Sequence, residues 1–143
     1  MNVELTNYAT PGDSLVSKVV ELVKKHALQK RVLFSSFYSA NLRKARSLLP
    51  EVPRGLLCMP GIAGFWGRTI SWRGDYFAVH PNLAEVNSGL VDRAHAAGKR
   101  VHVWTVNLEE DLQKMIALGV DAVFTDDPDL ALCLLGRSKV FLR

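Results

Sequence analysis

Short apolar segments alternate with longer amphipathic segments along this chain, and that alternation limits the possible folds more than any other feature. The clearest case is the strand-like run 101–106, which is followed by Leu112, Met115 and Ile116 at helical spacing up to Gly119. Strands that alternate with helices across short connections favour a parallel sheet with helices outside it. We therefore expect an α/β fold in one domain, either an open doubly wound sheet or part of a barrel.

The same reading assigns the remaining elements. Predicted strands lie at residues 3–5, 31–34, 55–58, 76–81, 101–106 and 122–125. Predicted helices follow five of them, with Asp13, Asn82 and Asn107 near their starts and Gly98, Gly119 and Gly136 at three ends. Residues 59–75 lack a clean period and contain four glycines, so they are predicted to form a long loop with at most one helical turn.

Composition excludes several classes of protein. The net charge of +4 comes from scattered Lys and Arg residues, which indicates a solvated surface rather than a nucleic-acid site. Cys58 and Cys133 lie in apolar runs without metal-ligand spacing, so both are predicted to be buried thiols. No segment approaches eighteen consecutive apolar residues and no export signal precedes the first strand, which predicts a cytoplasmic protein without a membrane span.

Two linked motifs near the C-terminus carry a family resemblance. The run Val-His-Val-Trp-Thr-Val-Asn at 101–107, a helix, and then Gly-Val-Asp-Ala-Val-Phe-Thr-Asp-Asp-Pro at 119–128 resemble the C-terminal signature of glycerophosphodiester phosphodiesterases. Upstream pieces occur in the family's order, so the resemblance runs from Asn2 to about Leu132. It implies a TIM-type (β/α) barrel. At 143 residues the chain is shorter than a typical complete barrel of about 250 residues. We expect about half to two-thirds of the barrel in residues 1–136, with 137–143 as a basic tail.

The opening strand, Asn-Val-Glu-Leu-Thr at 2–6, resembles the family's mid-barrel strand Asn-Ile-Glu-Leu-Lys. The resemblance makes Glu4 a metal ligand and places Thr6 at the substrate phosphate, where it replaces a Lys. It implies Mg²⁺ or Ca²⁺ as cofactor in the complete enzyme, together with a catalytic histidine pair. The motifs that supply this pair and the other carboxylates precede the opening strand in the family, so no catalytic residue is assigned here. Glu4 alone predicts weak or absent metal binding.

Three further residues are predicted to bind substrate, because they lie at or near strand ends where barrel sites are built: His80, Trp104 and Asn107. Trp104 could pack against a glycerol or choline-like group, or it could simply be a packing residue; Asn107 could instead be an N-cap. Asp127 is predicted to cap the last helix, and His102 to face the helical layer. Aromatic residues at 65, 66 and 72 would form either a lid or a separate hydrophobic cluster.

The resemblance thus implies metal-dependent hydrolysis of glycerophosphodiesters to glycerol 3-phosphate and an alcohol, with this chain as the C-terminal portion of the enzyme and inactive by itself. The alternative is a non-catalytic half-barrel that associates with itself or with a separate N-terminal half. An incomplete barrel leaves two edge strands, expected at 3–5 and 122–124, and neither contains the Lys or Pro that blunts an edge. A homo-oligomer, or a complex with the missing half, is therefore expected.

Overall fold

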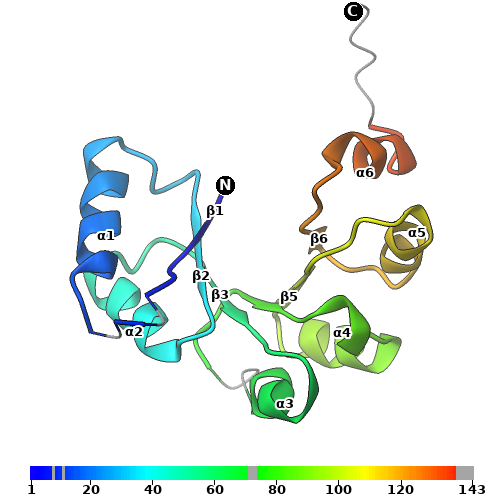
Figure 1. The fold of residues 1–143 in the computed structure, drawn as a ribbon, viewed down its shortest axis with the longest axis horizontal. Helices are drawn as coiled ribbons and strands as arrows, with labels where there is room; N and C mark the ends of the chain where they lie inside the picture. Colours follow the sequence, from blue (N-terminus) through cyan, green and yellow to red (C-terminus); the bar gives the residue numbers. More distant parts are fainter. Residues whose placement is uncertain (8, 11, 71–73, 138–143) are drawn as a thin grey trace, which may run out of the picture.

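The computed structural model describes residues 1–7, 9–10, 12–70 and 74–137. Its six strands are all parallel and follow one another in chain order across one sheet. They are β1 (Asn2–Glu4), β2 (Leu33–Ser36), β3 (Arg54–Leu57), β4 (Ala78–His80), β5 (Arg100–Val103) and β6 (Ala122–Val123). Figure 1 shows the sheet curling into an arc with the helices on its outer side. The consecutive order and this curl confirm a partial TIM-type barrel and exclude the doubly wound sheet.

Helices connect the strands as expected, with one addition. They are α1 (Leu15–Lys25), α2 (Ser39–Leu48), α3 (Gly61–Ile70), the short 3₁₀ helix η2 (Leu83–Glu85), α4 (Ser88–Ala96), α5 (Glu109–Ala117) and α6 (Pro128–Leu134). The prediction of a long loop at 59–75 is wrong, because α3 occupies most of it. Residue 72, assigned to the lid or cluster of aromatic residues, lies outside the described part of the chain.

Two hydrophobic cores fill the space between the sheet and its helices. In the first, Phe34 of β2 packs with Val20 of α1 and Leu42 of α2. In the second, Val101 and Val103 of β5 pack with side chains of the later helices, including Leu90, Ala94, Leu112 and Met115. Side chains alternate across a strand, so the residues between these core positions face the concave side of the arc. The sheet thereby directs Glu4, His80 and His102 to that side.

Several helix starts differ from the sequence prediction. Asn82 caps only η2, by accepting a hydrogen bond from the Ala84 amide, whereas Asn87 caps α4 by accepting from the Leu90 amide. Leu108, not Asn107, occupies the N-cap position of α5. The prediction for Asp127 is confirmed, since its Oδ1 accepts from the Leu130 amide at 3.0 Å.

The two cysteines differ in exposure. Cys58 is buried, but Cys133 is exposed on α6, so the prediction of two buried thiols is wrong for Cys133; neither forms a disulfide. In the predicted tail, the Arg137 amide bonds to the Leu132 carbonyl, and residues 138–143 lie outside the described residues. Within the described ranges, none of the helices is long and apolar enough to cross a bilayer.

Candidate functional site

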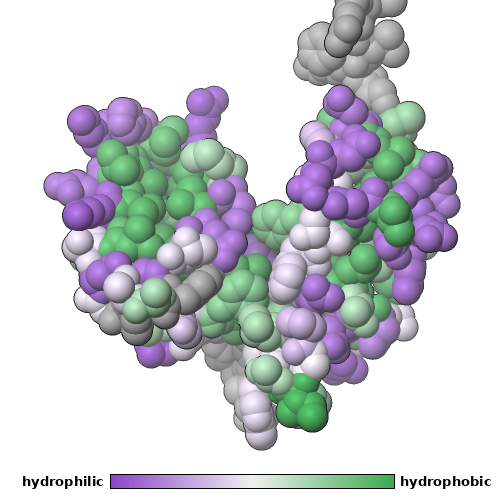
Figure 2. Space-filling model, in the orientation of Figure 1, coloured by the Kyte–Doolittle hydropathy of each residue, from purple (hydrophilic) through white to green (hydrophobic). Residues whose placement is uncertain are grey.

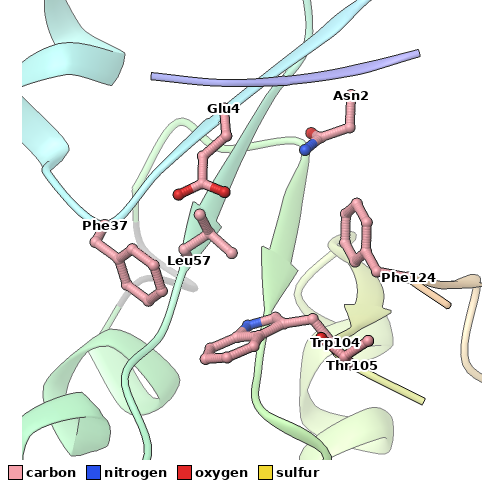
Figure 3. A pocket seen from close by; sticks show the side chains of 7 residues that line it. All are labelled: Asn2, Glu4, Phe37, Leu57, Trp104, Thr105 and Phe124. Atoms are coloured by element: carbon pink, nitrogen blue, oxygen red, sulfur yellow. The ribbon is translucent and has the colours of Figure 1, made fainter. Parts of the chain in front are cut away.

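A pocket of about 240 Å³ opens at the C-terminal ends of the strands, on the concave side of the arc. Its wall combines one carboxylate with three aromatic rings and is shown in Figure 3. The lining residues are Asn2, Glu4, Phe37, Leu57, Trp104, Thr105 and Phe124. They come from β1, β3 and the segments that follow β2, β5 and β6, so the curl of the sheet brings together positions far apart in the chain.

Glu4 supplies the carboxylate of this pocket. It is the last residue of β1 and pairs in register with Ser35 of β2. In Figure 3 its carboxylate points into the pocket, toward the space above the Trp104 indole and between Phe37 and Phe124. The carboxylate can therefore bind a cation or a hydrogen-bond donor of a ligand.

A complete metal site is not formed by these residues. Among the described residues there is no group of three His, Cys, Asp or Glu side chains that could hold a metal ion. Mg²⁺ prefers six oxygen ligands and Ca²⁺ six to eight, so Glu4 could contribute only one part of such a site.

Trp104 is held in place from two sides. Its indole Nε1–H donates a 2.7 Å hydrogen bond to the backbone carbonyl of His80, at the end of β4. Its ring meets that of Phe37 edge to face, with centroids 5.6 Å apart. These contacts fix the indole as one wall of the pocket, where its face can pack on an apolar or cationic group.

His80 lies beneath the pocket and does not line it. The residue is fully buried, and neither Nδ1 nor Nε2 has a hydrogen-bond partner among the described residues. Its ring packs against those of His102 and Phe124, at centroid distances of 4.8 and 5.2 Å. The pKa of His80 is lowered to about 3, mainly by burial and to a smaller extent by the neighbouring His102. His80 is therefore neutral near pH 7.

The orientation of His102 corrects the sequence prediction. Its ring contacts His80 on the concave side, whereas Val101 and Val103 face the helices. His102 and the two valines point to opposite sides of the sheet, as expected. However, the histidine lies on the concave side and not on the helical side that was predicted. Burial lowers the pKa of His102, with Asp121 opposing that shift.

Asn107 and Thr6 are also near strand ends but do not line the pocket. The Asn107 side chain spans to the segment after β6: its Oδ1 accepts from the Asp126 amide at 2.9 Å, and its Nδ2 donates to Asp126 Oδ2 at 2.7 Å. The alternative that Asn107 is an N-cap is therefore wrong. Thr6 is exposed two residues beyond Glu4. The sequence reasoning missed Phe37, three residues beyond the predicted strand 31–34, and Phe124, the penultimate residue of the predicted strand 122–125.

The fold and the pocket define a parallel (β/α) barrel portion with its candidate site at the C-terminal strand ends. The chain matches the Glycerophosphoryl diester phosphodiesterase family over residues 5–130. The match covers most of the chain, and the chain therefore belongs to this family.

Individual relatives agree with this membership. A glycerophosphodiester phosphodiesterase of Bacillus altitudinis is 35% identical over 145 residues, covering 97% of this chain and 57% of the relative. One of Caldanaerobacter subterraneus is 28% identical over 137 residues, covering 96% and 56%. Among solved structures, an Oleispira antarctica phosphodiesterase in complex with the product sn-glycerol 3-phosphate superimposes with a TM-score of 0.82 at 29% identity, covering 94% of this chain and 54% of that one. This chain thus spans about half the length of the relatives it matches.

Proposed function

We propose that this chain provides the C-terminal βα units, and one wall of the substrate site, of a metal-dependent phosphodiesterase that hydrolyses glycerophosphodiesters to glycerol 3-phosphate and an alcohol. The observation that carries the proposal is the convergence of Glu4, Phe37 and Trp104 on one pocket at the C-terminal strand ends. Family membership supports the substrate class, as does the product in the Oleispira phosphodiesterase.

Each pocket residue has a role suited to such a substrate. Trp104 and Phe37 offer an apolar wall for the carbon chain of the glycerol, or for a choline-like alcohol group through cation–π contact. Glu4 would be one ligand of a Mg²⁺ or Ca²⁺ ion, which in the complete site would offset the charge of the phosphodiester. Three other residues stay proposed substrate-binding positions although they do not line the pocket: His80, which lies beneath it, and Thr6 and Asn107, which lie beyond it.

The proposal predicts product binding without efficient turnover. The described residues that line the pocket include no proton-transfer pair, and such groups contribute factors of roughly 10² to 10⁴ each. We expect sn-glycerol 3-phosphate to shift the indole N–H resonance of Trp104 in an NMR titration. Trp104→Leu should weaken binding at least tenfold, whereas Trp66→Phe, which changes an exposed residue outside the pocket, should not.

Two results would contradict the proposal. One is the absence of any shift at millimolar sn-glycerol 3-phosphate. The other is rapid release of glycerol 3-phosphate from glycerophosphocholine, dependent on added Mg²⁺ or Ca²⁺ and abolished in Glu4→Ala. The second result would agree with the proposed substrate class. It would refute the idea that this chain provides only part of the site and another segment the rest.

A second candidate function is association without catalysis. It is favoured by the position of β1 and β6 at the two ends of the sheet, since a closed barrel has no such ends. Figure 2 shows a deep opening between the N-terminal and C-terminal parts of the arc. The partner would be a second copy of this chain or a separate N-terminal half, and it would complete the sheet at these strands.

A further inference from the structure

Helix α3 presents large apolar side chains to the outside of the molecule. Ile62 is 91% exposed, Trp66 65% and Phe65 52%, and Met59 just before the helix is 48% exposed. Ile62, Phe65 and Trp66 recur at intervals of three and four residues, so they share one face of the helix. We call these four residues the α3 face. Figure 2 shows hydrophobic atoms at the outer tip of the arc, where Figure 1 places α3.

The opposite side of α3 holds small and polar residues that fix the helix to the barrel. Gly64 and Gly67 lie close to the segment between β3 and α3. A Cβ on Gly64 would overlap the Met59 carbonyl, and one on Gly67 would lie 3.2 Å from Cys58 Sγ. Arg68 donates to the Met59 carbonyl at 2.6 Å and pairs with Glu85 at 3.0 Å. The helix is therefore seated by its glycines and arginine, and its large apolar residues are left for another contact.

The size of the α3 face argues against a stable protein partner. Four side chains of this kind expose an area on the order of 500 Å². A stable protein interface requires about 800 Å² from each partner. A lipid surface has no such threshold, because a few apolar side chains inserted at the headgroup level are enough for reversible binding.

The chemistry and position of the α3 face favour the same occupant. The α3 face contains no acidic residue, so it carries no charge that repels anionic lipid, and the chain as a whole has a net charge of +4. Tryptophan is enriched where membrane meets water. In Figure 1, α3 lies across the arc from β1 and from the helix α6 that follows β6. Completing the sheet at its two end strands would therefore leave the α3 face uncovered.

We propose that the α3 face, formed by Met59, Ile62, Phe65 and Trp66, inserts into the interfacial region of an anionic phospholipid bilayer. The helix lies parallel to the membrane plane, with Gly64 and Gly67 toward the barrel. The contact is peripheral and reversible, and it does not depend on hydrolysis or on the pocket at the strand ends.

The test is co-sedimentation of the full 143-residue chain with vesicles of phosphatidylglycerol and phosphatidylcholine, or of phosphatidylcholine alone. We expect binding to the anionic vesicles, with at least tenfold lower affinity for the neutral ones. The triple variant Ile62→Gln, Phe65→Gln, Trp66→Gln should lose at least tenfold in affinity. A matched triple variant at exposed leucines elsewhere, Leu22→Gln, Leu48→Gln, Leu108→Gln, should bind like the parent. Circular dichroism would verify the fold of both.

Fluorescence locates the insertion. Tryptophan emission should shift to the blue on addition of anionic vesicles, and Trp66→Phe should bind while losing most of that shift. The proposal is overturned if the parent does not bind anionic vesicles, if it binds neutral vesicles equally well, or if the α3 variant binds like the parent. It is also overturned if the α3 variant loses only a concentration-dependent self-association seen without lipid, since the face would then contact a second copy.

Discussion

The imidazole ring of His80 occupies the space that a side chain on Gly55 would need. A Cβ atom built on Gly55 would overlap ring atoms of His80, including Nε2. The two residues lie on the neighbouring strands β3 and β4, and His80 is wholly buried. The glycine on β3 therefore makes room for the histidine on β4, beneath the candidate site.

This contact predicts that Gly55→Ala destabilises the fold. The added methyl group must displace His80 or the strands, and such overpacking typically costs about 1–3 kcal/mol. Urea unfolding followed by circular dichroism would measure the loss. Gly89→Ala is the matched control, because its Cβ would meet mainly the flexible end of Arg93 and it lies in helix α4. Equal stability of Gly55→Ala and the parent would contradict the packing described.

His80 also predicts a pH dependence of stability. Its pKa is lowered to about 3 in the folded chain, below the usual value of about 6.5 in the unfolded chain. The unfolded state then binds the extra proton, so the contribution of neutral His80 is complete above about pH 6.5 and is lost as the pH falls toward 3. The folding equilibrium constant should fall by up to about tenfold per pH unit in this range.

The measurement is urea unfolding between about pH 7 and about pH 5, where carboxyl groups stay ionised. His80→Leu removes the titrating group and should flatten the dependence. Part of the slope should persist, because burial also lowers the pKa of His102. A slope in His80→Leu as steep as in the parent would assign the effect to other groups.

Much of this arrangement follows from sequence patterns, and the exceptions have physical causes. Strand positions were predictable because apolar runs between turn residues are local signals, whereas the order of the strands in the sheet was implied only by the family resemblance. Helix α3 was missed because its packing side is made of Gly64 and Gly67, which leave no apolar period to detect. The side of the sheet on which His102 lies was predicted wrongly. Alternation along a strand shows which residues share a face, but it does not show whether that face is turned toward the helices or toward the concave side.

In the candidate site, too, some features were predictable from the sequence and others were not. Glu4 and Trp104 were identified from motifs, and the structure places both in one pocket. The fit of His80 against Gly55 could not be predicted, because it depends on the register of two strands separated by more than twenty residues. Asn107 resembled a cap because its backbone precedes a helix, but its side chain bonds to a segment nineteen residues away.

The bridge from Asn107 predicts a local effect on the segment after β6. Asn107→Ala removes the bonds to the Asp126 amide and carboxylate, so this amide should exchange its hydrogen faster and stability should fall by about 1 kcal/mol. Gln113→Ala, which removes an exposed bond to Glu109 within α5, should change stability by only a few tenths of a kcal/mol. Unchanged exchange at Asp126 in Asn107→Ala would show that the bridge does not hold this segment.

The two thiols should react at very different rates. Burial raises the pKa of Cys58 to about 12, so almost no thiolate is present near pH 8, whereas Cys133 is exposed on α6. We expect a thiol reagent such as iodoacetamide to label one cysteine in the native chain and both in urea. Cys133→Ser should abolish the native labelling and Cys58→Ser should leave it intact. Fast labelling of native Cys133→Ser would mean that Cys58 is accessible.

The end strands of the sheet predict association in solution. Within the described ranges, β1 and β6 each have a neighbouring strand on one side only, and residues 3–5 and 122–124 contain neither Lys nor Pro. Such strands tend to pair with another chain. Light scattering across a dilution series should therefore give a mass above 15.9 kDa that decreases on dilution.

A charge placed on the edge should oppose that pairing. Ala122 is exposed on β6, so Ala122→Lys should shift the equilibrium toward monomer, whereas Ala117→Lys, which changes an exposed residue of α5, should not. A monomer of 15.9 kDa that persists at high concentration and unfolds cooperatively would show that the chain needs no partner at its edges. The second candidate function would then lose its physical basis, while the proposed substrate site would be unaffected.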